Sequence, residues 1–146
     1  MITSVGIIPY RKNSEGEYEF FLGHPGGHYW EGKDYWSFLK GEMAKGEDEK
    51  DTAVREFGEE SGIALTEEEI DRMWYLGKIR QNQRKYAIAY ALEKEDIDPA
   101  RCFSNLVDDA DFPEIDMYQW IPFSSLEGKT HEKYMTFYNK IKEQKH

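Results

Sequence analysis

The chain has 146 residues, of which 39% are hydrophobic and 15% aromatic, and its formal net charge is −10. This composition excludes an intrinsically disordered chain and predicts one globular domain over residues 1–146. A phosphate backbone would repel so acidic a protein, so extended nucleic acid is not an expected partner. A small phosphorylated molecule, screened by metal ions, is compatible with the charge.

The cysteine content and the N-terminus bear on the compartment. Cys102 is the one cysteine of the sequence, so no intramolecular disulfide can form, which suits a reducing environment. The first residues do not combine a basic segment with a long apolar run, and no apolar stretch is long enough to span a bilayer. We therefore expect a cytoplasmic protein without membrane association. The oligomeric state is open, and a homodimer is one option.

The N-terminal part predicts strands and an unusual loop. An apolar run that ends at Pro9 and a second run over residues 18–22 flank a polar turn, which indicates an antiparallel strand pair. Residues 24–34 are rich in glycine and aromatic side chains, which predicts a loop. A short strand is expected over residues 35–39.

Two helical segments are predicted next. The first begins with Asp48 as N-cap and ends at Gly62, a favourable residue just past a helix. Val54 and Phe57 give this helix an apolar face. Capping-box spacing predicts a second, short helical turn over residues 66–72.

The second half alternates strands with an acidic stretch. Strands are predicted over residues 74–79, 86–92 and 117–121, and residues 93–114 lack periodicity and indicate a long loop. A last helix is expected with Thr130 as its N-cap and with apolar residues at helical spacing: Tyr134, Phe137, Tyr138 and Ile141. This order predicts an α+β fold, a mixed β-sheet packed with helices.

Three acids dominate the first predicted helix. Glu56, Glu59 and Glu60 are spaced i, i+3 and i+4, so a helix places them on one face. Oxygen ligands without a nearby cysteine or histidine pair suit Mg²⁺ or Mn²⁺. A solvated acidic face is the ordinary interpretation of such a cluster in a glutamate-rich protein. The three acids alone therefore leave both interpretations open.

The residues around the acids suggest supporting contacts. Gly41, upstream of the helix, could bring a backbone carbonyl near the cluster. Glu47 could pair with Arg55 and fix the preceding loop against the helix. Because Arg55 directly precedes Glu56, we expect the arginine to point to a different face from Glu56 and to lie one turn from Glu59.

The full pattern over residues 41–63 resembles the signature of the Nudix hydrolase family. Its fixed positions all match: Gly41, Glu47, Arg55, Glu56, Phe57, Glu59, Glu60, Gly62 and Ile63. The resemblance implies an α/β/α sandwich that hydrolyses a nucleoside diphosphate linked to another moiety. It also implies that Glu56, Glu59 and Glu60 bind Mg²⁺ or Mn²⁺, with the Gly41 carbonyl as a further ligand and Glu47–Arg55 as the supporting ion pair.

The implied reaction is the attack of water on a pyrophosphate phosphorus. Bound metal would orient the phosphates, stabilise developing charge and lower the pKa of the attacking water. The general base varies within the family. The candidates here are Glu59 on the helix and three acids of the long loop, Glu93, Glu95 and Glu114.

The approach to this signature carries a second resemblance. It rests on His24-Pro25-Gly26-Gly27, Trp30, Lys33-Asp34, Trp36-Ser37 and Lys40. These residues resemble a bacterial subgroup described only as NTP pyrophosphohydrolases. Lys40-Gly41 and Gly46-Glu47-Asp48 resemble, more weakly, the diadenosine polyphosphate hydrolases. Both groups usually have proline before the lysine, where this chain has Leu39. Nucleoside triphosphates and dinucleoside polyphosphates are thus the leading expected substrates.

Three further residues are candidates for substrate binding. Lys40 and Arg80 could each contact a phosphate, or be ordinary solvated cations. Trp30 could stack on a base or simply cover the sheet, and we expect core packing for Trp36. His24 and its neighbour His28 lack a third zinc ligand, so no zinc site is expected.

Two alternatives to a hydrolase are compatible with the fold. One is a Nudix-fold module that senses a nucleotide without turnover, although such a module would not need the complete set of acids. The other is the fold-related isopentenyl diphosphate isomerase, which needs a catalytic cysteine. The context of Cys102 does not support that role.

Overall fold

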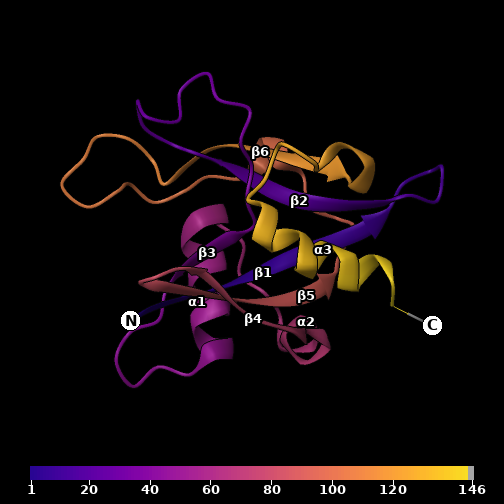
Figure 1. The fold of residues 1–146 in the computed structure, drawn as a ribbon, viewed down its shortest axis with the longest axis horizontal. Helices are drawn as coiled ribbons and strands as arrows, with labels where there is room; N and C mark the ends of the chain where they lie inside the picture. The colour runs from indigo at the N-terminus through magenta and orange to yellow at the C-terminus, as the bar shows by residue number, and fades with distance from the viewer. Residues whose placement is uncertain (145–146) are drawn as a thin grey trace.

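The computed structural model describes residues 1–144, and their strands form one mixed six-stranded sheet (Figure 1). The strand order is β4-β5-β1-β2-β6, and β3 also pairs with β1. β1 and β5 run parallel, while the other neighbours are antiparallel. The strands are β1 (Ile2–Lys12), β2 (Tyr18–Pro25), β3 (Leu39–Glu42), β4 (Trp74–Asn82), β5 (Lys85–Glu93) and β6 (Ile115–Pro122).

Helices cover both faces of this sheet. In Figure 1, α3 (Met135–Lys142) crosses the front face and α1 (Glu49–Ser61) lies behind the strands. A shorter helix, α2 (Glu67–Arg72), precedes β4. The predicted α+β fold and the implied sandwich are therefore confirmed. No helix among residues 1–144 is long and apolar enough to cross a membrane.

Alternation along β1 divides the core into two layers. Val5 and Ile7 pack with Phe57 of α1, whereas Ile8 and Tyr10 pack on the opposite face with the buried side of α3. The residues predicted to form the apolar face of the last helix are all buried, one in the 3₁₀ turn before α3 and three on α3: Tyr134, Phe137, Tyr138 and Ile141.

The sequence predicted that the first strand ends at Pro9, but β1 continues past it to Lys12. The Thr3 carbonyl accepts from Met43 beyond β3, and the Tyr10 carbonyl accepts from Lys94 on the β5 side, so odd positions of β1 face β3 and β2. β3 pairs with β1 only through Ile7, and β2 pairs from Tyr10 onward. Pro9 therefore faces the gap between these partners, where a missing N–H costs no ladder hydrogen bond.

The short strand predicted over residues 35–39 is misplaced. β3 begins at Leu39, and Ser37 forms only an isolated bridge with Gly23. The position of β3 is set by its partner β1, where Gly41 lies opposite Val5, and that pairing is distant in the sequence. Gly41, the first glycine of the signature, therefore lies on β3 rather than after a strand.

The helix ends agree with the sequence prediction where the capping residue directly neighbours the helix in the sequence. The Asp48 side chain caps α1, Gly62 ends α1 with φ +78°, and Thr66 forms the predicted capping box. The prediction for Thr130 was wrong, because His131 accepts from the Lys133 amide and starts a 3₁₀ turn ahead of α3.

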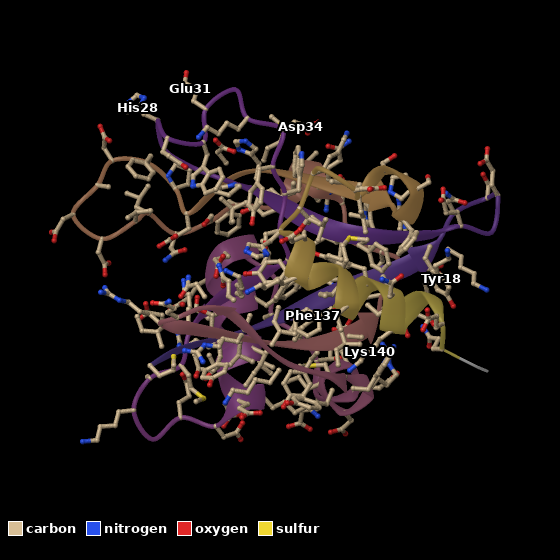
Figure 2. All side chains as sticks on the ribbon, in the orientation of Figure 1. Tyr18, His28, Glu31, Asp34, Phe137 and Lys140 are labelled. Atoms are coloured by element: carbon tan, nitrogen blue, oxygen red, sulfur yellow. The ribbon has the colours of Figure 1, made fainter. Side chains whose placement is uncertain are left out.

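Lysine side chains cover the outer edge of β4. Lys140 Nζ of α3 donates to the Leu76 carbonyl at 2.6 Å. Lys133 Nζ donates to the carbonyls of Arg80 and Gln81 at 3.2 and 3.1 Å. Figure 2 shows Lys140 and the buried Phe137 on the same helix. Edge carbonyls that no strand pairs are thereby satisfied.

Candidate active site

An arginine at the centre of α1 organises the candidate site. Arg55 Nε donates to Glu47 Oε2 at 2.8 Å, and Nη2 donates to Oε1 of the same carboxylate at 2.9 Å. This bidentate pair ties the loop before α1 to the helix, as the sequence predicted. Arg55 Nη2 also donates to the Glu42 carbonyl at 3.2 Å, so the end of β3 is held as well.

Glu47 is locked in place by several donors. Besides Arg55, the Thr52 hydroxyl and the Ala44 amide donate to its carboxylate at 2.8 and 3.1 Å. The hydrogen bond from Arg55, with those from Ala44 and Thr52, lowers the pKa of Glu47 to about 2. Glu47 therefore stays ionised at neutral pH and acts as a fixed anchor for Arg55 rather than as a proton carrier.

Arg55 also contacts two of the predicted metal ligands. Its Nη1 donates to Glu56 Oε1 at 2.8 Å and to Glu59 Oε2 at 2.9 Å. The expectation that Arg55 would point away from Glu56 was therefore wrong. A long guanidinium can reach back to its neighbour along the helix, where it offsets the charge of both carboxylates.

Gly41 contributes to the site by its lack of a side chain. A Cβ at this position would lie 2.0 to 2.4 Å from the carboxylate atoms of Glu56, so only glycine lets that carboxylate rest against β3. The Met43 amide donates to the Thr3 carbonyl of β1. Backbone groups of every second residue in a strand point the same way, so the Gly41 carbonyl also faces β1. The register thus favours Lys40, whose carbonyl faces the free edge, over Gly41 as a backbone ligand.

Glu60 is the buried acid of the cluster. It is only 5% exposed, and its Oε2 is buried without a hydrogen-bond partner among residues 1–144. Burial raises the pKa of Glu60 far above its ordinary value, and the neighbouring Glu56 carboxylate raises it further. The Tyr118 hydroxyl of β6 donates to the Glu60 carbonyl, which fixes this end of α1 against the sheet.

Glu114 is brought to the same cluster by the long loop. The Glu114 amide donates to the Asn105 carbonyl, and the Asn105 amide donates to the Glu59 carbonyl, both at 2.9 Å. Burial raises the pKa of Glu114, and the charge of Glu56 adds to the effect. The sequence did not reveal Asn105 as the link, because this backbone contact depends on how the loop folds.

Lys40 is a second cation whose charge acts on these acids. Burial and the charge of Lys85 lower the pKa of Lys40 to about 8, while Glu60 and Glu114 oppose that change. Its Nζ also lies 5.8 Å from the Tyr134 ring centroid. A half-buried lysine without a hydrogen-bonded acid is suited to bind an anionic ligand.

Two predicted base candidates lie elsewhere. Glu93 and Glu95 line a cavity of about 650 Å³ at the opposite end of β1, together with Tyr10 and Lys94. Glu93 pairs with Tyr10 in the sheet, five positions along β1 from the partner of Gly41. At roughly 3.3 Å per residue, this is about 17 Å from the acid cluster.

The remaining substrate-binding candidates differ in their setting. Trp30 stacks on Tyr35 with ring centroids 4.7 Å apart, in the loop whose Gly26 amide donates to the Glu114 carbonyl. Arg80 lies on β4, and its guanidinium donates to the carbonyls of the turn that follows. The structure therefore brings the loop of Trp30 to the acids but does not bring Arg80 there. Trp36 is buried, as predicted.

The acids fit a divalent cation chemically, although no three of them among residues 1–144 are arranged with metal-site geometry. An unpartnered buried oxygen of Glu60 beside Glu56 is an arrangement that a cation would stabilise. The oxygen-only donor set suits Mg²⁺ or Mn²⁺. Arg55 forms ion pairs with Glu56 and Glu59, so a metal cation would compete with its guanidinium for the two carboxylates.

A model of the NUDIX domain matches residues 2–141, nearly the whole chain. The chain therefore belongs to the Nudix family, whose hydrolases act on phosphoanhydride bonds, and the resemblance of residues 41–63 is confirmed. A search of curated proteins finds no match.

Solved structures share the fold at low sequence identity. A C. elegans Ap4A hydrolase binary complex is 21% identical, with 87% of this chain and 85% of that chain covered and a TM-score of 0.59. The NUDIX domain of Shewanella oneidensis NrtR complexed with ADP ribose is 10% identical, with 97% and 87% covered and a TM-score of 0.68. A MutT/nudix family protein from Enterococcus faecalis is 16% identical with a TM-score of 0.61; 83% of this chain is covered but only 43% of that one.

Proposed function

We propose that this chain is a Mg²⁺- or Mn²⁺-dependent pyrophosphohydrolase that cleaves a nucleoside diphosphate linked to another moiety. The observation that carries the proposal is the buried, unpartnered oxygen of Glu60, held next to Glu56 within a complete Nudix signature. Buried like charges destabilise a fold unless a cation offsets them. A cluster retained at that cost is best explained by ligation.

Glu56, Glu59 and Glu60 would hold the metal, and the free-edge carbonyl of Lys40 is the backbone oxygen beside them. Bound Mg²⁺ or Mn²⁺ would supply charge stabilisation at the phosphates and a lowered pKa for water. Arg55 and Glu47 serve as positioning residues, because the ion pair fixes the approach of β3 and its loop to α1.

Glu114 is the general base that the geometry favours. It is half-buried near the acids, and its raised pKa improves its ability to accept a proton from water. Its backbone is held on both sides, by the carbonyl of Asn105 and the amide of Gly26. Glu59 remains the alternative base, whereas the distance along β1 argues against Glu93 and Glu95.

Nucleoside triphosphates and dinucleoside polyphosphates are the proposed substrates. Lys40 would bind a phosphate beside the acids, and Trp30 would provide an aromatic surface for a base. The likeness to an Ap4A hydrolase supports a dinucleoside polyphosphate, and the flanking residues 24–42 support a triphosphate.

The test is a panel of nucleotides assayed for release of phosphate or pyrophosphate, with Mg²⁺, with Mn²⁺ and with a chelator. Glu59→Gln should lower metal-dependent kcat by roughly a hundredfold or more, because the change removes a ligand charge while keeping the shape of the side chain. Glu67→Gln, an exposed acid of α2, is the matched control and should be unaffected. Activity of Glu59→Gln within about twofold of wild type would refute the metal assignment.

A nucleotide-sensing module is the second candidate function. The fold neighbour with ADP ribose in its NUDIX domain supports it. Binding of a nucleotide by calorimetry, with no turnover of any panel member under either metal, would favour sensing over hydrolysis.

A further inference from the structure

Lys40 lies on the face of the sheet that α3 covers, at a close contact between β3 and β1. Leu39 packs in the core layer of α1, so alternation along β3 places Lys40 on the opposite face. Lys40 pairs with Gly6, where a Cβ would lie 2.7 Å from the Lys40 Cβ and 2.2 Å from the Leu39 carbonyl oxygen. Glycine at position 6 therefore lets β3 approach β1 with the lysine above it.

A second lysine lies on the same face, on β5. Ala87 packs in the core layer beneath α3, so alternation places Lys85 on that face as well. Lys85 pairs with Ile2 of β1. Because Lys40 pairs with Gly6, the two lysines lie four positions apart along β1, about 13 Å at roughly 3.3 Å per residue. Lysine side chains are long enough to span part of this separation, and the charge of Lys85 acts on Lys40.

A histidine in the 3₁₀ turn before α3 adds a hydrogen-bond donor. The Lys133 amide donates to His131 Nδ1 at 3.2 Å, and a backbone amide only donates, so the ring proton of neutral His131 lies on Nε2. Burial lowers the pKa of His131, and the charges of Lys133 and Lys40 lower it further. The charge of Glu132 opposes this change without reversing it. His131 Nε2 is therefore a neutral donor within reach of the Lys40 charge.

A buried tyrosine fixes the positions of the histidine and of Lys40. The Tyr134 ring centroid lies 5.0 Å from the His131 ring and 5.8 Å from Lys40 Nζ. Tyr134 is 1% exposed, and its hydroxyl donates to Gln81 Oε1 at 2.9 Å. Its ring also packs edge-on against Phe38 of the chain leading into β3, at 5.1 Å. The turn of His131 and the strand of Lys40 therefore meet on one ring that the core holds in place.

The two lysines lack the acids that neutralise other lysines of the chain. Among residues 1–144, Lys40 and Lys85 form no ion pair, whereas Lys94 contacts two acids. Glu60 and Glu114 act on Lys40 only through their charge. In Figure 1, α3 crosses the sheet away from β3 and from the β4–β5 turn, so the helix does not cover this end of the face. An anion bound here would offset the repulsion between the two ammonium groups.

We propose that Lys40, Lys85 and His131 form a subsite for the terminal phosphate of a nucleoside triphosphate, beside the acid cluster. The inference rests on the proposed function and deepens it by naming the substrate class. A terminal phosphate carries a charge of about −1.5 to −2 near neutral pH and has three acceptor oxygens. An internal phosphate of a dinucleoside polyphosphate carries a single negative charge. Two lysines and a neutral donor match the terminal group, so triphosphates are the preferred substrates.

Steady-state kinetics of Lys85→Gln test which substrate class uses the subsite. At about 0.15 M salt, which screens long-range attraction, the KM for a nucleoside triphosphate should rise about tenfold, the effect of one charge-assisted hydrogen bond. The kcat should stay within about twofold, and the KM for a dinucleoside tetraphosphate should change by less than about twofold. Lys12→Gln, at an exposed position on the opposite end of β1, is the matched control and should behave as wild type.

His131→Asn tests the neutral donor while keeping the turn. The asparagine oxygen can still accept from the Lys133 amide, but the shorter side chain no longer presents a donor at the position of Nε2. The KM for a nucleoside triphosphate should rise about threefold, the effect of one neutral hydrogen bond, with kcat unchanged. An unchanged KM would exclude His131 from the subsite.

Binding of inorganic triphosphate in chelator tests the subsite apart from turnover. Calorimetric titration of wild type, Lys85→Gln and Lys12→Gln should give a dissociation constant about tenfold higher in Lys85→Gln alone. Side-chain ¹⁵N shifts of Lys40 and Lys85 should move during the wild-type titration. If these results hold while no nucleotide is turned over with either metal, the subsite stands and the proposed function fails.

Three results would overturn the proposal. The first is an unchanged KM for triphosphates in Lys85→Gln. The second is an equal rise in KM for triphosphates and dinucleoside polyphosphates, which would show a general attraction to charge. The third is undiminished binding of inorganic triphosphate by Lys85→Gln. Metal-dependent turnover alongside any of these results would leave the proposed function intact.

Discussion

The two ends of β1 handle clustered charge in opposite ways. At the acid cluster, Glu60 is buried without a hydrogen-bond partner for Oε2, and both it and Glu114 have raised pKa values. At the other end, Lys94 contacts Glu69 and Asp96, and the pKa values of these two acids are lowered. One cluster is destabilised by its own charges and the other is neutralised internally.

The cavity described above does not coincide with the proposed active site. The cavity of about 650 Å³ lies at the neutralised end, where acids already have partners. Unsatisfied carboxylates at the other end are the feature that calls for a ligand. The proposed site therefore follows from perturbed charge and not from cavity volume.

The largest effect on the acid cluster is expected when Glu56 is displaced. Gly41→Ala places a methyl group about 2 Å from the Glu56 carboxylate, which must move. We expect a loss in kcat/KM of roughly a hundredfold, typical of a displacement near 1 Å in a catalytic site. Gly58→Ala is the control: its Cβ would lie 3.5 Å from the nearest atom, the Ile63 carbonyl oxygen. It should remain active and gain about 0.5–1 kcal/mol in unfolding free energy.

A smaller effect should appear in the stability of the metal-free protein. Because the pKa of Glu60 is raised on folding, the folded state binds a proton more tightly, and stability falls as pH rises above the ordinary glutamate range. Urea denaturation in chelator should show a loss of more than about 1 kcal/mol between about pH 5 and pH 8. Glu60→Gln should reduce this slope and leave the contribution of Glu114, whose pKa is also raised, and Mg²⁺ should offset the Glu60 contribution only in wild type. An undiminished slope in Glu60→Gln would assign it to other groups.

The smallest effect is expected at the neutralised end. Lys94→Gln leaves Glu69 and Asp96 without their cation, which should lower unfolding free energy by about 1 kcal/mol at neutral pH. Hydrogen bonding to Lys94 lowers the pKa of Asp96. The difference in unfolding free energy between wild type and Lys94→Gln should therefore shrink as pH falls through the acid range. The kcat should be unchanged, and a fall of tenfold or more would show that the two ends are not independent.

Local chemistry explains what the sequence could predict. Arg55 lies on α1 and Glu47 lies in the loop just before it, so their pairing could be predicted from their short separation in the sequence. The caps at Asp48 and Gly62 depend on neighbouring backbone groups and were likewise foreseen. The apolar face of α3 follows from its helical period.

Distant pairing explains what the sequence could not predict. The start of β3 and the tolerance of Pro9 depend on which strands lie beside β1. Glu114 and Glu93 were equal candidates along the chain, and only the loop contact through Asn105 separates them. The engagement of Glu56 by Arg55 depends on the bend of a long side chain, which spacing does not fix.

The lysines that cover β4 have a consequence for association. An exposed strand edge is a template on which another copy of the chain can add a strand. Here Lys133 and Lys140 bind the outward carbonyls and set positive charge along that edge. A second β4 approaching edge to edge would meet the same charge and occupied acceptors. The two lysines therefore disfavour addition of a further strand on this side of the sheet.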